Sequence, residues 1–368
     1  MVRLDKKIKG VYNTLKSSLQ NNLQKEKGMY KLTDEQCELV IGKASAWLYD
    51  YCRKAGLHYT VVGSSGGLDS ALTLALSQRA CQLAKADGYH LVSIGITMPC
   101  ESSDDSLILG REAIRAFGAD EVHIDLTQLF QMAAGKFPMD ELIKKVRLLG
   151  LDPKLLDTLY EIKKAELLPG INEQARNILV KYNDTKGLEA FDKSAKVAQG
   201  NNKARLRMLF GTYHFARMLK TGIVLSTDNL SEFWMAFWTI CGDVGDIGMI
   251  QQMLKGLELY DLARHMKVPA GILKAIPDDG LGIGNGDADQ IGATYPHVDR
   301  IIIQLVQQGF DVDGSREQLE TLPSLEGYSD EVVLKVARRA VNGAFKRHGT
   351  YVLSRKKLGL PEVRDIKL

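Results

Sequence analysis

The 368-residue sequence lacks the features that mark secreted, membrane-embedded or zinc-stabilised proteins. Its five cysteines are odd in number and scattered, with no Cys-x-x-Cys pair, so neither a zinc site nor a disulfide framework is indicated. The start, MVRLDKKIKG, has no apolar segment after its charges and so does not resemble a signal peptide. No apolar stretch approaches the length needed to span a bilayer. We therefore expect a cytoplasmic protein with reduced thiols and no membrane partner.

The chain also lacks a strong charge of either sign. A formal net charge of +3 is too small to indicate a nucleic-acid partner. Lysines and arginines gather near both ends, which is typical of solvated tails. With 45% hydrophobic and 25% charged residues, the composition is that of an ordinary globular protein with a large core.

What is present is an alternation of short apolar runs with helical patterns. Thr33 and Gln36 form a capping box that opens an amphipathic helix over residues 34–55. Further helices are expected over 68–86 and, capped by the stretch Ser102-Ser103-Asp104-Asp105, to about 117. Strands are expected at 60–64, 91–99, 121–126 and 222–227. Because these strands are almost continuously apolar, the pattern predicts an α/β fold: a doubly wound parallel sheet with helices on both faces.

The organisation along the chain predicts one large domain with additions. Residues 1–32 form an N-terminal extension, 33–355 the main domain and 356–368 a C-terminal tail. Residues 130–198 show only helical patterns, broken by prolines and a glycine, and are interpreted as a helical insertion. The glycine-rich stretch 278–292 is too polar for a regular element and is interpreted as a mobile loop that closes over the active site.

One turn carries most of the functional information. In VVGSSGGLDSALTLAL (61–76) a strand passes through five small residues into a helix. The stretch formally satisfies Gly-x-Ser-x-Gly, which would expose Ser65 as a nucleophile. A hydrolase would also need a histidine after a later strand, but His123 lies inside a predicted strand. His214, His265 and His297 follow no strand end. This interpretation is therefore disfavoured.

Phosphate binding explains the same turn better. No Lys-Ser/Thr pair follows the glycines and no Gly-x-Gly-x-x-Gly spacing is present, so two familiar phosphate loops are excluded. In a strand–SGGLDS–helix unit, glycines let the backbone approach a phosphate, and the helix N-terminus supplies N–H donors. Asp69 in the first helical turn suits a divalent cation bridging it to phosphate. The alternative is that Asp69 only caps the helix.

The motif resembles the PP-loop of N-type ATP pyrophosphatases, which cleave ATP between the α and β phosphates. Other motifs follow in the order found in NAD synthetases, and the similarity extends over about 34–128 and 198–350. They are QGNNKARLRM (199–208), STDNLSE (226–232), CGDVGDIG (241–248), MLK (253–255) and GATY (292–295).

The resemblance implies a ligase that makes NAD. ATP would adenylate the nicotinate carboxylate of deamido-NAD, and ammonia would then displace AMP to form the amide. Magnesium and ATP are the implied cofactor and co-substrate, and a homodimer with the dinucleotide along its interface is the implied assembly. Glutamine-using relatives carry an amidase domain ahead of the synthetase, and about 30 residues precede the first helix here, so ammonia is the expected nitrogen donor.

The resemblance also assigns site residues. ATP phosphates would be held by Gly63, Ser64, Ser65, Gly66, Gly67, Leu68, Asp69 and Ser70. Thr227 and Lys255 would contact ATP, with Lys255 and Asp69 catalytic. Asp69 and Glu232 would bind magnesium, and Arg205, Asp246 and Lys346 would bind deamido-NAD.

Two observations from the residues agree with this assignment. Glu232 follows the end of the predicted strand 222–227, at the sheet edge where ligands bind, although a helix N-terminus would also favour a glutamate there. Lys203, Arg205 and Arg207 place three cations in five residues, which at this place favours anion binding over a solvated face.

Three positions depart from the family pattern: Ile240 replaces a lysine, Phe345 a histidine and Asp278 a serine or threonine. Two other functions therefore stay open. The first alternative is another PP-loop enzyme that amidates a different carboxylate. The second is a relative that binds nucleotide without catalysis. The presence of both Asp69 and Glu232 argues against a non-catalytic protein.

Overall fold

The computed structural model describes residues 30–136, 139–148, 154, 157–158, 167–242, 245–278 and 286–347. The predictions for the tail 356–368 and for most of the extension 1–32 lie outside these residues. Within them, no helix is long and apolar enough to cross a lipid bilayer.

A parallel sheet of five strands forms the centre of the fold, in the order β3-β2-β1-β4-β5. The strands are β1 (Tyr59–Gly63), β2 (Val92–Thr97), β3 (Asp120–His123), β4 (Gly222–Ser226) and β5 (Ile247–Gly248). Tyr59 of β1 pairs with Val92 on one side and with Gly222 on the other. The fold-class prediction is confirmed, and all four predicted strands are present. The two-residue β5 is too short to leave a pattern in the sequence.

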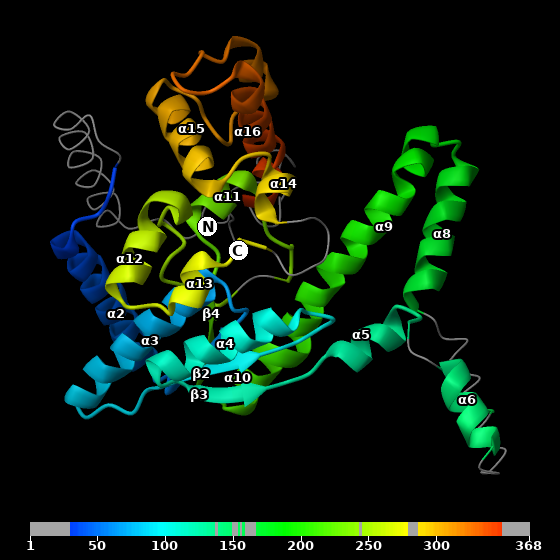
Figure 1. Ribbon diagram of the computed structural model, residues 1–368, viewed down its shortest axis with the longest axis horizontal. Coiled ribbons are helices and arrows are strands. Elements are labelled where there is room, and N and C mark those ends of the chain that lie inside the picture. The colour runs from blue at the N-terminus through cyan, green and yellow to red at the C-terminus, as the bar shows by residue number, and fades with distance from the viewer. Residues whose placement is uncertain are drawn as a thin grey trace, which may run out of the picture.

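Helices cover both faces of this sheet (Figure 1). On one face α3 (Leu68–Ala86) and α4 (Asp104–Phe117) pack on β1, β2 and β3, and α2 (Asp34–Ala55) packs on α3. On the other face the π-helical turn η1 (Arg207–Tyr213) and α10 (His214–Met218) contact β1 and β4. The capping box is confirmed, since Thr33 Oγ1 accepts from Gln36 N at 3.2 Å and Gln36 Oε1 accepts from Thr33 N at 2.9 Å.

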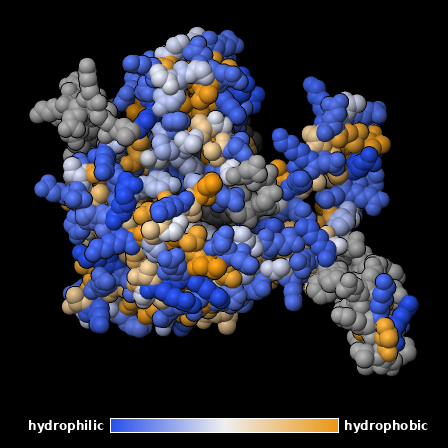
Figure 2. Space-filling model, viewed as in Figure 1, coloured by the Kyte–Doolittle hydropathy of each residue, from blue (hydrophilic) through white to orange (hydrophobic). Residues whose placement is uncertain are grey.

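The region interpreted as an insertion consists, in its described residues, of helices joined by short turns. Its helices are α5 (Thr127–Ala133), α6 (Met139–Leu148), α8 (Leu167–Lys181) and α9 (Thr185–Leu206). α8 and α9 pack against each other and project from the rest of the molecule (Figure 1). Ile171, Ile178 and Val180 of α8 are about half exposed, and Figure 2 shows apolar side chains gathered on this projecting pair. The domain boundaries themselves stay predictions.

The C-terminal part of the chain is mostly helical, and its last helices form a second apolar core, while buried residues between 259 and 272 pack into the core around the sheet. Its elements are α11 (Leu230–Met235), η2 (Lys255–Leu259), α12 (Tyr260–His265), α13 (Ala270–Lys274), α14 (Asp287–Ile291), α15 (Tyr295–Gln307), η3 (Arg316–Thr321), α16 (Asp330–Asn342) and α17 (Ala344–Arg347). Buried residues of α15 and α16, among them Ile301 and Val336, fill this core. The core lies beyond one edge of the sheet, with α11 between the two parts (Figure 1).

One expectation about this part is wrong. The stretch 278–292 was expected to contain no regular element, but α14 forms within it and ends at Gly292, whose φ is +97°. The physical reason lies in burial: the Ile291 side chain packs into the second core, and Asp287 is only 3% exposed. Residues 279–285, where most of the glycines lie, fall outside the described part.

Candidate active site

The candidate site lies where the strand order of the sheet reverses. The strand order runs from β1 to β2 and β3 on one side and to β4 and β5 on the other, so the reversal lies between β1 and β4. Open α/β sheets bind ligands outside the carboxyl ends of the strands at such a point. A cleft of about 460 Å³ opens there. It is lined by the turn Gly63–Ser70, by residues after β2 and β4, and by side chains of the C-terminal helices.

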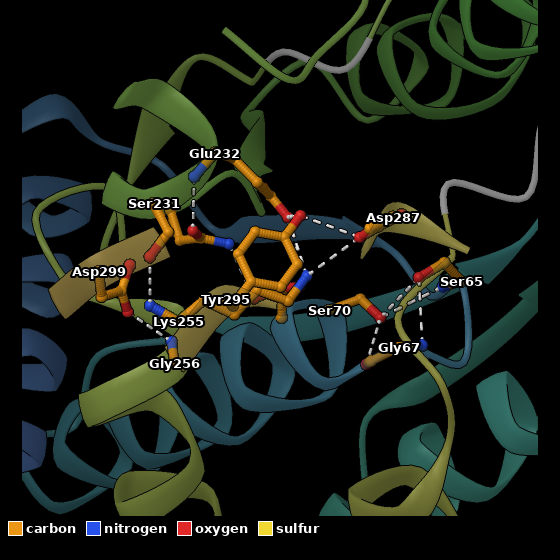
Figure 3. A network of polar contacts seen from close by, with 12 residues as sticks. Ser65, Gly67, Ser70, Ser231, Glu232, Lys255, Gly256, Asp287, Tyr295 and Asp299 are labelled. Carbon is orange, nitrogen blue, oxygen red and sulfur yellow. Dashed lines mark hydrogen bonds and ion pairs between the residues drawn. The ribbon is translucent and has the colours of Figure 1, made fainter. Parts of the chain in front are cut away.

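The small-residue turn is held in shape by its own hydroxyls. Ser70 Oγ lies 3.1 Å from both Ser65 Oγ and the Gly67 carbonyl oxygen, and Ser65 Oγ accepts from Gly67 N at 3.3 Å (Figure 3). Gly66 has φ +85°, and a Cβ there would lie 2.5 Å from the Ser106 carbonyl oxygen of α4. Only glycine therefore fits at this point of the turn.

The same geometry gives no support to a nucleophilic serine. Ser65 Oγ contacts Ser70 and Gly67, and no histidine is found among the described residues that line the cleft. A serine nucleophile needs a base within hydrogen-bond reach. Ser65 acts here as part of the turn.

Buried charges meet at the opposite side of the cleft. Lys255 Nζ lies 2.8 Å from Asp69 Oδ2, 2.9 Å from Glu232 Oε1 and 3.9 Å from Asp287 Oδ2. It also lies over the Tyr295 ring, 4.3 Å from the ring centroid (Figure 3). Lys255 is only 5% exposed, so one buried ammonium group joins carboxylates from α3, α11 and α14.

Burial and mutual attraction set the ionisation of this cluster. Burial raises the pKa of Glu232 above its ordinary value; the Lys255 ammonium opposes that rise and the Asp69 carboxylate adds to it. For Lys255, burial favours the neutral amine, but Asp69 and Glu232 outweigh it and hold its pKa above the ordinary value. Burial also raises the pKa of Tyr295 well above its usual range. Lys255 is therefore charged, and its positive charge keeps the acids close together.

Asn229 joins two of the predicted site residues. Its Nδ2 donates to Asp69 Oδ1 at 3.1 Å, and its Oδ1 accepts from Glu232 N at 3.0 Å as the N-cap of α11. One amide side chain thus fixes the distance between the helix starts that carry Asp69 and Glu232.

The donors present fit a hard divalent cation. Asp69 and Glu232 each direct a carboxylate oxygen to within 3 Å of one point, which Lys255 Nζ occupies. In the described part of the chain, no three His, Cys, Asp or Glu side chains form a metal site by themselves. Two carboxylates are nevertheless what Mg²⁺ ordinarily takes from a protein when water and substrate phosphates complete its shell.

The predicted substrate residues lie outside the cleft. Arg205 Nε donates to the Ile240 carbonyl at 3.3 Å, and Lys346 Nζ donates to the Ala236 and Trp238 carbonyls at 2.9 and 2.6 Å. The structure therefore brings Arg205 and Lys346 to the two ends of one short segment, 236–240. Asp246 lies elsewhere: it pairs with Arg217 at 3.1 Å and accepts from Val224 N at 2.9 Å.

Of the other positions singled out in the sequence, two line the cleft and two lie at the surface. Thr227 and Asp278 are among the residues that line the cleft. Ile240 is 44% exposed and Phe345 65% exposed, so two of the three departures from the family pattern lie at the surface of this chain.

The cations predicted for anion binding hold a loop of the cleft. Arg207 donates to the Met98 carbonyl and to Ser102 Oγ, each at 3.1 Å, and Lys203 Nζ lies 3.7 Å from a Glu101 carboxylate oxygen. Lys203 is 8% exposed, so these residues are not a solvated face. Arg207 itself lines the cleft.

Sequence reasoning missed Asp287, Asn229 and Asp299. Asp287 lay in a stretch interpreted as loop, and its hydrogen bond to Tyr295 Oη at 2.9 Å is made only when α14 and α15 meet. Asn229 had a usable signal, because Asn-Leu-Ser-Glu after a strand is typical of a helix N-cap. Asp299 had none beyond its place on the apolar face of a helix.

Known proteins match this chain over most of its length. The family model described as NAD synthase matches residues 40–148 and 161–350. An NH(3)-dependent NAD(+) synthetase from Alkaliphilus oremlandii is 25% identical over 262 residues, which are 71% of this chain and 84% of that protein. One from Methanosarcina acetivorans is 25% identical over 80% of this chain and 89% of its own length.

Solved structures share the fold. An NMN synthetase from Francisella tularensis aligns with a TM-score of 0.55 at 19% identity, covering 86% of this chain and 98% of that one. An NH3-dependent NAD synthetase from Campylobacter jejuni aligns with a TM-score of 0.52 at 18% identity, covering 86% and 99%. With a family model that matches more than half of the residues, the chain belongs to the NAD synthase family and is an enzyme of this type.

Proposed function

We propose that this enzyme amidates deamido-NAD with ammonia, using ATP and Mg²⁺ and releasing AMP and pyrophosphate. NAD synthases use ATP as a co-substrate, and the relatives from Alkaliphilus oremlandii and Methanosarcina acetivorans are described as NH(3)-dependent. The observation that carries the proposal is the convergence of Asp69 and Glu232 on one point beside a turn built for phosphate. Carboxylates placed there serve a phosphoryl-bearing substrate that a cation bridges to the protein.

The first step activates the nicotinate carboxylate. One of its oxygens attacks the α-phosphorus of ATP, the bond from that phosphorus to the bridging oxygen breaks, and pyrophosphate leaves. The backbone N–H groups of Gly63–Ser70 and the start of α3 hold the phosphates, as helix N-termini do. Lys255, once turned away from Asp69 and Glu232, would offset part of the negative charge that develops on them.

Asp69 and Glu232 are the residues that would hold Mg²⁺, which when bound supplies positive charge to the phosphate oxygens of ATP. Because Lys255 Nζ lies between the same two carboxylates, its flexible side chain has to turn toward the phosphates when the cation is bound.

The second step forms the amide. Ammonia attacks the carbonyl carbon of the acyl-adenylate, the bond to the AMP oxygen breaks, and the nitrogen loses a proton to give the neutral amide. A carboxylate cannot react this way directly because its leaving group would be oxide, and adenylation provides a good one. No covalent enzyme intermediate is needed, in agreement with the place of Ser65 inside the turn.

Binding of the dinucleotide is proposed for Arg205, Asp246 and Lys346, at the interface of a homodimer. In support, none of the three is among the described residues that line the cleft of a single chain, so a long substrate would need further surface. C2 dimers are the commonest closed assemblies. Light scattering at micromolar concentration is expected to give a dimer, and a fully active monomer would contradict this part. A cytoplasmic location also stays a prediction.

One assay tests the reaction. The protein is incubated with ATP, Mg²⁺, ammonium and deamido-NAD, and NAD and pyrophosphate are measured by chromatography. We expect both in equal amounts. Pyrophosphate release with another carboxylic acid, but no NAD, would show a different substrate. ATP binding without pyrophosphate release for any acid would show a non-catalytic relative. Glutamine in place of ammonium should give no NAD.

A further inference from the structure

Three successive backbone amides around Lys255 are each bound by a side chain. Leu254 N donates to Glu258 Oε2 at 2.8 Å. Lys255 N donates to Ser231 Oγ and Gly256 N to Asp299 Oδ2, also at 2.8 Å (Figure 3). We call Glu258, Ser231 and Asp299 the amide clamp.

The clamp meets a physical need of this segment. The first amides of a helix have no partner within the helix. η2 begins at Lys255, and its N-cap residue, Leu254, provides no side-chain hydrogen bond. Other side chains therefore have to accept from these N–H groups, and the direction of the Lys255 side chain depends on where those side chains lie.

Two of the clamp residues belong to the helices that carry the partners of Lys255. Ser231 precedes Glu232 on α11, and Asp299 lies one turn after Tyr295 on α15. Asp299 is fully buried, with 0% of its surface exposed, and does not line the cleft among the described residues. The proposed reaction gives it no role of its own.

Close backbone contact makes the same connection independently. A Cβ on Gly256 would lie 2.3 Å from Pro296 N and 2.4 Å from the Tyr295 carbonyl carbon. η2 and the start of α15 therefore touch through a position that only glycine allows, so a shift of α15 moves the backbone beside Lys255.

The clamp reaches beyond the region that matches the family model. Tyr30 Oη donates to Glu258 Oε1 at 3.0 Å, and Leu32 N donates to Asp261 Oδ2 at 2.9 Å. The family match begins at residue 40, so this contact comes from the segment before α2. Glu258 thus divides its two oxygens between that segment and the amide preceding Lys255.

We propose that Asp299 and Glu258 are positioning residues for Lys255, and that Tyr30 extends this positioning to the N-terminal segment. They hold the Lys255 backbone so that its ammonium lies between Asp69 and Glu232 in the structure seen here and stays within reach of the ATP phosphates when it turns toward them. The proposal rests on the proposed function, in which Lys255 acts on ATP.

The test measures the position of Lys255 in the full-length protein. An acyl-phosphate derivative of ATP transfers its acyl group to a lysine amine beside the phosphates, and mass spectrometry quantifies the label on Lys255. Hydrogen exchange of residues 254–256 and the kcat and KM for ATP are measured on the same samples. The variants are Asp299→Leu, Asp299→Asn and Tyr30→Phe. Ser329→Ala is the control, because it removes the N-cap of α16 and destabilises the same helical core without touching the clamp.

We expect Asp299→Leu to lower both kcat and labelling of Lys255 by about a hundredfold, with KM for ATP nearly unchanged, because small displacements of a reacting group have effects of this size. Asp299→Asn keeps an oxygen that accepts from Gly256 N and should stay within about threefold of the wild type. Tyr30→Phe loses one hydrogen bond and should lower labelling about threefold. Ser329→Ala should lower stability alone.

Equal labelling of Lys255 in the wild type and in Asp299→Leu would overturn the proposal. If Asp299→Leu does not fold, a further variant, Glu258→Leu, takes its place, and unchanged labelling in both Glu258→Leu and Tyr30→Phe would overturn the proposal. If the wild type itself is not labelled and makes no NAD, the proposed function fails. In that case hydrogen exchange of the backbone amides of residues 254–256 tests the clamp. Faster exchange in Asp299→Leu than in the wild type supports the clamp, and unchanged exchange overturns it.

Discussion

The two walls of the cleft are built in different ways. The wall on the sheet side is a single stretch, Gly63–Ser70, which continues into α3. The wall on the helical side takes Glu232 from α11, Lys255 from η2 and Asp287 from α14. The first is held by hydroxyls within the turn, and the second by contacts between residues far apart in sequence. A backbone site for phosphate can therefore be read from a short motif, whereas a buried charge cluster exists only in the folded chain.

The walls also differ in what burial costs them. Apart from Asp69, the sheet wall presents backbone groups and serine hydroxyls, several of which are satisfied by hydrogen bonds within the turn. The helical wall buries an ammonium and carboxylates, and each such charge is stable only while its partners stay in place. A lost partner on the helical side should therefore cost more than one hydrogen bond.

The largest expected effect comes from changing one carboxylate on each wall. Asp69→Asn and Glu232→Gln each remove a charged ligand with little change of shape, so turnover should fall about a hundred- to a thousandfold while the fold survives. Steady-state assays with ATP, Mg²⁺, ammonium and deamido-NAD measure this. Asp104→Asn, another first-turn acid but an exposed one on α4, is the matched control and should be normal. Near-normal turnover in either site variant would show that the walls do not share a cation.

The next effect isolates the sheet wall. Gly66→Ala forces a φ of +85° on a residue with a Cβ and pushes that Cβ against the Ser106 carbonyl. We expect a loss of about 3 kcal/mol in the free energy of unfolding, together with weaker ATP binding. Urea denaturation and calorimetry check both.

Gly42→Ala is the control for that change. Gly42 lies inside α2 with nothing within 4 Å of an added Cβ, so alanine should stabilise the protein by about 1 kcal/mol. Equal stability of the two glycine variants would contradict the packing of α4 on the turn.

The last effect concerns the support of the helical wall, changes stability more than turnover, and appears as a pH dependence. Burial raises the pKa of Asp299 from 3.8 to about 7, in spite of hydrogen bonds from Ser231 and Gly256. The folded chain then keeps a proton that the unfolded chain has lost. The stability due to the neutral carboxyl is fully present below about pH 4 and is lost as the pH rises toward 7.

Asp299→Asn removes this titration. As the pH rises from 4 to 7, the free energy of unfolding of Asp299→Asn should increase relative to that of the wild type, by at most about 4 kcal/mol. Urea denaturation at several pH values measures the difference. A difference that does not change with pH would show that Asp299 ionises in the folded protein as readily as in water.

The comparison of the walls also explains what the sequence could predict. Helices 34–55 and 68–86 were predicted with the bounds observed for α2 and α3, because a capping box and a strand–turn–helix motif act locally. α14 was missed because its glycine-rich surroundings favour a loop, and burial of Ile291 and Asp287 overrides that preference. Similarly, Arg205 and Lys346 both contact segment 236–240, whereas Asp246 contacts Val224. These positions depend on tertiary contacts, so the sequence could not predict them.

The contact between Gly256 and the start of α15 limits how this protein can change during evolution. Any side chain at position 256 would run into the backbone at Tyr295 and Pro296, so a substitution there has to be preceded by a change that moves the whole helix. Single mutations at this position should be purged, while mutations on the outer surface of α15 accumulate freely. A glycine at position 256 in a diverged copy of this protein therefore indicates that η2 and α15 keep the spacing seen here, and any other residue indicates that the spacing has changed.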